Sequence, residues 1–245
     1  MVAVAHGSRD PRSAATVSAL VARVRRAQPE LDVRLSFLDL NTPRLPDVLA
    51  AVAADGHREA VVVPLLLGSA FHARVDIPGT VAEANQQHPW LRVAVADVLG
   101  AHPVLTGAAL RRLASVAGPL DDPDLGVLLA ATGSTRPAAN AAVHRLADGW
   151  ARCHPWRGAV AAFATASPTV PEAIDTLRAA GAARIAVASW FLAPGLLPTR
   201  VARSARQVDP AIRVAAPLGD DPSIADVIAI RYRNAVAAPR LQHAS

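Results

Sequence analysis

The feature that most constrains the fold of this chain is an internal repeat that runs through most of its length. Residues 126–134 mirror residues 2–8, and residues 218–222 mirror residues 99–103. Between these points, landmarks recur at a constant offset of 125 residues, which pairs Pro43 with Pro168, Pro46 with Pro171, and Gly56 with Gly181. So many landmarks in the same order predict two domains of one fold.

Within each half, short apolar runs alternate with segments of helical periodicity. Residues 2–5 form an apolar run that stops at His6, and the apolar residues of 17–24 then recur at helical spacing. Residues 60–67 form a continuous aliphatic run, which is typical of a parallel strand buried on both faces. Four strand–helix units per half predict an α/β fold, with two similar doubly wound parallel-sheet domains and a cleft between them.

The linker between the halves, residues 117–124, is rich in Gly, Pro and Asp. We expect an N-terminal α/β domain over residues 1–118. A C-terminal α/β domain over residues 124–245 is then a degenerate copy of it.

The composition excludes several classes of protein. Of the 245 residues, 52% are hydrophobic and 18% charged, which is too apolar for a disordered chain. Cys153 is the only cysteine and cannot form an internal disulfide, as expected in a reducing compartment. The apolar stretches 60–71 and 185–198 are too short to span a bilayer, and the N-terminus lacks a signal-peptide pattern. We therefore expect a cytoplasmic protein without a membrane partner.

All 25 basic residues are arginines, and the formal net charge is +5. They are scattered, without interleaved aromatic residues or a nucleic-acid-binding motif, which favours a small anionic ligand over DNA or RNA. The chain has no Walker lysine and no G-x-G-x-x-G motif after a strand. The absence of both motifs argues against a nucleotide-dependent mechanism.

Three side chains with suitable chemistry follow the first three predicted strands, namely His6, Asp39 and His72. With a 2-1-3 strand order, their loops are neighbours at the carboxyl edge of one sheet, where ligands bind in such folds. Two imidazoles and a carboxylate can hold a divalent transition metal and leave positions open, and either imidazole can accept a proton near neutral pH. A single histidine in a loop, or a carboxylate that caps a turn, would not indicate a metal site. The prediction depends on His6, Asp39 and His72 lying close together.

The second half lacks these ligands. At the equivalent positions it carries Thr132, Ala164 or Thr165, and Leu197. We therefore expect one active site. The domain of residues 1–118 carries its metal-binding and catalytic residues, and the second half covers it.

The sequence resembles a known family, the sirohydrochlorin cobalto- and ferrochelatases of the class II chelatases, in their long duplicated form. Residues 5–11, Ala-His-Gly-Ser-Arg-Asp-Pro, resemble its opening motif. Residues 64–68 with Phe71-His72 and Asp76-Ile77-Pro78 resemble its second motif. Asp39 falls where many relatives carry a metal-contacting Glu, so here the carboxylate is one methylene shorter.

The resemblance implies insertion of Co²⁺ or Fe²⁺ into sirohydrochlorin, with loss of two pyrrole protons, in siroheme or cobalamin biosynthesis. The metal is a substrate, and neither ATP nor a tightly bound cofactor is implied. His6 and His72 would bind the metal and accept the protons, with Asp39 assisting.

Sirohydrochlorin bears eight carboxylates, which call for planar, bidentate partners. The cleft-facing loops carry candidate substrate-binding residues in both halves, namely Ser8, Arg9, Arg74, Arg136 and Arg200. Surface arginines are common in a chain with 25 of them, so each of these assignments needs its own test.

Two other functions remain open. The same cleft could serve a non-catalytic carrier of the metal or the tetrapyrrole, which would stop at one equivalent where an enzyme turns over. A ligand-sensing domain is a third candidate, but no DNA-binding or membrane segment accompanies it. The choice of metal stays open, and a monomer is expected because one chain supplies both halves.

Overall fold

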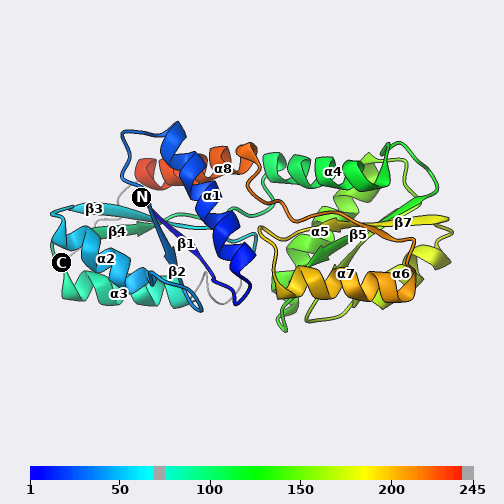
Figure 1. Cartoon of the computed structure of the whole chain (residues 1–245), viewed down its shortest axis with the longest axis horizontal. Helices are drawn as coiled ribbons and strands as arrows, with labels where there is room; N and C mark the ends of the chain where they lie inside the picture. Colours follow the sequence, from blue (N-terminus) through cyan, green and yellow to red (C-terminus); the bar gives the residue numbers. More distant parts are fainter. Residues whose placement is uncertain (69–74, 239–245) are drawn as a thin grey trace. The chain divides into compact units, whose positions relative to one another are not determined.

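The computed structural model describes residues 1–68 and 75–238, and strands and helices alternate throughout them (Figure 1). The first repeat contains β1 (Val2–Ala5), α1 (Pro11–Ala27), β2 (Arg34–Phe37), α2 (Leu45–Ala54), β3 (Glu59–Pro64), α3 (Ile77–Gln87), β4 (Arg92–Val95) and α4 (Pro103–Ala117). The second contains β5 (Leu125–Ala131), α5 (Pro137–Cys153), β6 (Gly158–Phe163), α6 (Val170–Ala179), β7 (Arg184–Ser189), α7 (Leu196–Val208), β8 (Arg213–Val214) and α8 (Pro222–Ala237).

Each repeat forms a four-stranded parallel sheet. The strand orders are β2-β1-β3-β4 and β6-β5-β7-β8, so the predicted α/β fold and the 2-1-3 order are confirmed in both halves. The pairing of β1 with β2 runs from Val2 opposite Arg34 to Ala5 opposite Phe37, which aligns the carboxyl ends of the two strands.

The central strands are buried as their aliphatic sequences predict. All four residues of β1 and all seven of β5 are buried. In the first sheet, Val4 and Val62 pack with Leu49 of α2 and Ile77 of α3. The predicted strand 60–67 is shorter in the structure: β3 ends at Pro64, although the Leu65 N–H still donates to the Val4 carbonyl at 2.8 Å.

The chain forms two compact units whose limits differ from those of the sequence repeats. Unit 1 comprises Met1–Gly7, Ser18–Gly100 and the chain from Ile224 onward, and unit 2 comprises Ser8–Val17 and Ala101–Ser223. The last helix of each repeat therefore belongs to the unit built on the other repeat: α4 packs on β7 in unit 2, and α8 belongs to unit 1. The domain limits predicted from the sequence, 1–118 and 124–245, instead keep each helix with its own repeat.

Each sheet has helices on both faces. In unit 2, α4 lies on one side of the sheet and α6 and α7 on the other, and in unit 1, α8 lies opposite α2 and α3 (Figure 1). Helix α8 buries Ile224, Val227 and Ile228, and Arg231 Nη2 donates to the Leu99 carbonyl at 2.8 Å. Across residues 1–68 and 75–238, none of the helices has the length and apolarity to cross a membrane.

Candidate functional site

The loops that follow β1 and β2 are bonded together at the carboxyl edge of the first sheet. The Leu38 N–H donates to the Ala5 carbonyl at 2.9 Å, and the Asp39 N–H donates to the His6 carbonyl at 2.8 Å. These bonds continue the β1–β2 ladder two residues beyond the strands. The structure therefore brings together two of the three residues predicted to form the site, His6 and Asp39.

Gly7 makes this close approach possible. Its φ is +97°, and a Cβ built on it would lie 1.7 Å from the Asp39 carbonyl oxygen. Only glycine combines that backbone conformation with that clearance. Gly133, at the same place in the second half, has φ +86°, and its Cβ would lie 2.6 Å from the Phe163 Cβ. Both repeats thus use one turn to hold the first loop against the second.

The Asp39 carboxylate is exposed and held from one side. Its Oδ1 accepts a hydrogen bond from the Leu40 N–H at 2.8 Å and pairs with Arg44 Nη1 at 3.1 Å. Arg44 Nη1 also donates to the Leu38 carbonyl at 2.8 Å, which fixes the guanidinium over the loop. The Asp39 side chain is 57% exposed, and its Oδ2 makes no hydrogen bond within the described part of the chain. One carboxylate oxygen is therefore available to a ligand.

Sequence analysis missed Arg44 and Leu40. Leu40 is the only non-glycine residue with positive φ in the described ranges, at 64°, and its side chain is 44% exposed. A left-handed leucine is unexpected because the conformation crowds its Cβ. For Arg44, the signal was its place five residues after Asp39, within reach of the carboxylate.

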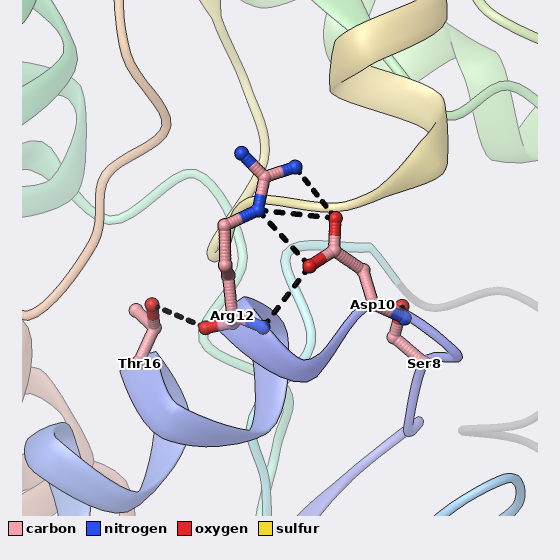
Figure 2. Close-up of polar contacts among 4 residues, drawn as sticks. All are labelled: Ser8, Asp10, Arg12 and Thr16. Carbon is pink, nitrogen blue, oxygen red and sulfur yellow. Dashed lines mark hydrogen bonds and ion pairs between the residues drawn. The ribbon is translucent and has the colours of Figure 1, made fainter.

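A second polar cluster lies at the start of α1 (Figure 2). Asp10 Oδ1 accepts from the Arg12 N–H at 3.0 Å, and Asp10 Oδ2 pairs with Arg12 Nη2 at 2.6 Å. The Arg12 side chain, and then its backbone N–H, hold the pKa of the Asp10 carboxyl below its usual range. Ser8 Oγ accepts from the Asp10 N–H at 3.1 Å, while Arg9 is exposed. Asp10 thus caps α1 and remains ionised beside two predicted substrate-binding residues.

The second half repeats the loop geometry with different side chains. The Ala164 and Thr165 N–H groups donate to the Ala131 and Thr132 carbonyls at 2.9 and 3.0 Å, and Thr165 Oγ1 also donates to the Thr132 carbonyl at 2.8 Å. The pair that corresponds to His6 and Asp39 therefore supplies hydroxyl groups in place of an imidazole and a carboxylate.

The two arginines predicted for this half lie in the same region of unit 2. Arg136 precedes α5 and is exposed, and Arg200, on α7, donates from Nη1 to the Ala164 carbonyl at 3.5 Å.

Two predicted site residues, His72 and Arg74, lie outside the described residues. Asp76, read from the sequence as a helix cap, occupies the N-cap position of α3, but its side chain makes no capping hydrogen bond. Among the described residues, no group of three or more His, Cys, Asp or Glu side chains could hold a metal ion.

The family model CbiX matches the chain twice, over residues 1–116 and 126–235. The chain belongs to the CbiX family. The two matched segments follow the sequence repeats and together include every predicted site residue.

Named relatives of this CbiX-family chain are chelatases. It is 23% identical over 208 residues to the sirohydrochlorin cobaltochelatase of Priestia megaterium, covering 83% of this chain and 67% of that protein. It is 24% identical over 239 residues to the sirohydrochlorin ferrochelatase of Bacillus subtilis (strain 168), covering 96% of this chain and 90% of the relative.

Solved structures agree in fold. The sirohydrochlorin chelatase SirB from Bacillus subtilis subspecies spizizenii, in complex with cobalt, superposes with a TM-score of 0.77 at 22% identity, over 98% of this chain and 96% of that one. This likeness confirms the two-domain α/β architecture expected for the chelatase family.

Proposed function

We propose that this CbiX-family protein is an ATP-independent sirohydrochlorin chelatase that inserts Co²⁺ or Fe²⁺ into the tetrapyrrole as a step of siroheme or cobalamin biosynthesis. The observation that carries the proposal is the backbone bond between Asp39 and His6, which sets an imidazole-bearing loop beside an exposed carboxylate at the sheet's carboxyl edge. The names of its relatives supply the substrate class. The metal is a substrate, and no tightly bound cofactor is proposed.

In this proposal His6 and His72 bind the incoming metal, and Asp39 offers its Oδ2. Few protein ligands suit the task because a metal that must pass to the tetrapyrrole cannot be held in a closed tetrahedral cage. As the metal binds the four pyrrole nitrogens, two N–H protons must leave. An imidazole that is neutral near pH 7 is a suitable acceptor, so His6 and His72 also relay these protons.

The substrate's carboxylates bind to arginines. Arg9, Arg136 and Arg200 carry exposed guanidinium groups on loops or helix starts that follow strand ends. Ser8 and Arg74 complete the proposed set. A guanidinium presents two parallel donors to a carboxylate, which suits a substrate with carboxylates around its rim.

The decisive experiment follows the absorbance of sirohydrochlorin under anaerobic conditions after addition of Co²⁺, Fe²⁺ or Ni²⁺. The wild type should convert many equivalents, and the double variant His6→Ala, His72→Ala should lose insertion, by about 10²-fold or more, because ligand and proton acceptor go together. His57→Ala is the matched control, since His57 precedes β3 at the amino end of the strand. Full activity of the double variant would refute the mechanism.

The same assay separates an enzyme from a carrier. A non-catalytic carrier of the metal or tetrapyrrole would stop at one equivalent per chain, whereas a chelatase continues until substrate is exhausted. We expect a cytoplasmic protein, as a single cysteine fits a reducing compartment, and a monomer, since the duplication supplies both halves in one chain.

A further inference from the structure

A cavity of about 630 Å³ lies within unit 2, beside α7. Its walls come from β7, from the loop that follows β7, from α7, and from residues 214–217 at and after β8; Arg12 of α1 also contributes. The cavity therefore opens beyond the carboxyl ends of two neighbouring strands, where α/β sheets bind small molecules.

The floor of this cavity is apolar. Val187, Phe191, Val201 and Ala215 line it and are 0%, 8%, 2% and 3% exposed, respectively. Such a surface favours the ring or chain of an organic molecule over a fully hydrated ion.

One polar group interrupts the floor. Ser189, at the end of β7, is 5% exposed and lines the cavity, and its hydroxyl makes no hydrogen bond within the described part of the chain. The hydroxyl is not one of the fully buried side-chain groups that lack a partner, so it reaches the open space of the cavity and can bond to a molecule there.

The rim is cationic. Arg203 and Arg206 of α7 line the cavity and are exposed, and neither has an ion-pair or hydrogen-bond partner among the described residues. Arg12 is already paired with Asp10. None of the described residues that line the cavity is an aspartate or a glutamate. Two uncompensated guanidinium groups above an apolar floor attract an anion.

The internal repeat shows that the Ser189 hydroxyl is not required by the fold. At the offset of 125 residues that relates β3 to β7, the first half carries Pro64 where the second carries Ser189. The hydroxyl is therefore particular to the half that lacks the proposed metal ligands.

We propose that this cavity is a binding site for a small organic anion with an apolar ring or chain. The apolar body lies on Val187 and Val201, a polar atom bonds to the Ser189 hydroxyl, and the acidic group binds Arg203 and Arg206. Gly195 of the cavity wall lies near Ser8, a proposed substrate-binding residue, so binding is tested without metal or tetrapyrrole and sirohydrochlorin is used as a competitor.

The test is a fluorescence titration of the full chain with 8-anilinonaphthalene-1-sulfonate, an aromatic sulfonate. We expect one equivalent to bind, and Arg203→Ala, Arg206→Ala to weaken the affinity about tenfold, as two exposed charge contacts predict. The charge-matched control is Arg145→Ala, Arg213→Ala, in which two exposed arginines outside the cavity are removed; its affinity should equal that of the wild type.

Obstructing the cavity should weaken binding. Ala216 is exposed and lines the cavity, so Ala216→Trp places an indole ring at its wall without disturbing a buried position, and Ser189→Ala removes the hydroxyl alone. We expect weaker binding in both variants, with unchanged circular dichroism.

Three results would overturn the proposal. The first is equal affinity in the wild type and Ala216→Trp. The second is equal binding of the uncharged analogue N-phenyl-1-naphthylamine, since the arginines would then contribute nothing. The third is one-for-one displacement of the probe by sirohydrochlorin, which would make the cavity part of the tetrapyrrole site.

Discussion

At the scale of single residues, Gly7 determines whether the loops that carry His6 and Asp39 can lie together. Gly7→Ala adds a methyl group 1.7 Å from the Asp39 carbonyl oxygen at a φ of +97°. We predict a loss of about 2–5 kcal/mol in the free energy of unfolding, because backbone strain and the clash add. Urea unfolding followed by circular dichroism measures it.

Gly149→Ala is the control for this variant. Gly149 lies within α5, and a Cβ built there meets nothing within 4 Å. Alanine should stabilise the protein by about 0.5–1 kcal/mol through helix propensity. Equal effects of the two substitutions would contradict the close approach of the loops at Gly7.

Leu40 is the second residue whose backbone matters. Its φ of 64° costs a residue with a Cβ roughly 1–2 kcal/mol, part of which glycine recovers. Leu40→Gly should therefore raise the free energy of unfolding by about 0.5 kcal/mol, whereas Leu40→Ala keeps the cost and should not. Urea midpoints compare the three proteins, and a more stable alanine variant would refute the explanation by backbone strain.

At the scale of elements, three helices begin at ionised carboxylates. Asp10 accepts the Arg12 N–H before α1, Glu172 the Thr169 N–H at α6, and Asp221 the Ser223 N–H before α8. Hydrogen bonds from Arg12 lower the pKa of Asp10, and the bond from the Thr169 N–H lowers that of Glu172. Burial raises the pKa of Asp221, but bonds from Ser223 and Arg111 outweigh it, and the pKa is lowered.

These shifts predict acid sensitivity. A carboxyl whose folded-state pKa lies below its unfolded value stabilises the fold above about pH 4, the ordinary range of Asp and Glu, and loses this effect as the pH falls through the folded-state pKa. The free energy of unfolding should therefore decrease from pH 5 to pH 3. Glu172→Gln keeps a capping side chain but cannot titrate, so its decrease should be smaller. A flat profile in the wild type would contradict the prediction.

The elements themselves were largely predictable from sequence. Apolar runs located the strands, and prolines such as Pro46 and Pro78 marked helix starts to within a residue, because proline suits the first turn of a helix. The adjacency of His6 and Asp39 followed from strand order alone. The left-handed Leu40 did not, since glycine or asparagine usually takes that conformation, and the pairing of Asp39 with Arg44 depended on how the loop folds back.

At the scale of the whole molecule, the sequence did not reveal that α4 and α8 change units. The repeat gives both helices similar patterns, and an amphipathic pattern states which face is buried but not which sheet buries it. The exchange therefore depends on tertiary packing and could not be predicted from the sequence pattern.

The exchange predicts which fragments fold. Residues 119–245 lack α4, whose Leu105, Ala108 and Leu113 are buried in unit 2, whereas residues 101–223 retain it. We expect cooperative urea unfolding, followed by tryptophan fluorescence, for the fragment 101–223 and not for 119–245. Equal stability of the two fragments would refute the assignment of α4 to unit 2.

The position of α8 near the C-terminus also determines when the first sheet can be completed during synthesis. The four strands of the first sheet are complete by Val95, but the helix that covers one of their faces begins only at Pro222. Helix α1, whose Leu20 and Val24 are buried, is made early, but at roughly 5–20 residues per second the rest of that face waits for α8 for on the order of ten seconds. The half that carries His6 and Asp39 is therefore the last to mature, and a nascent chain that stalls before α8 leaves the part of the sheet that α8 covers open to chaperones and proteases.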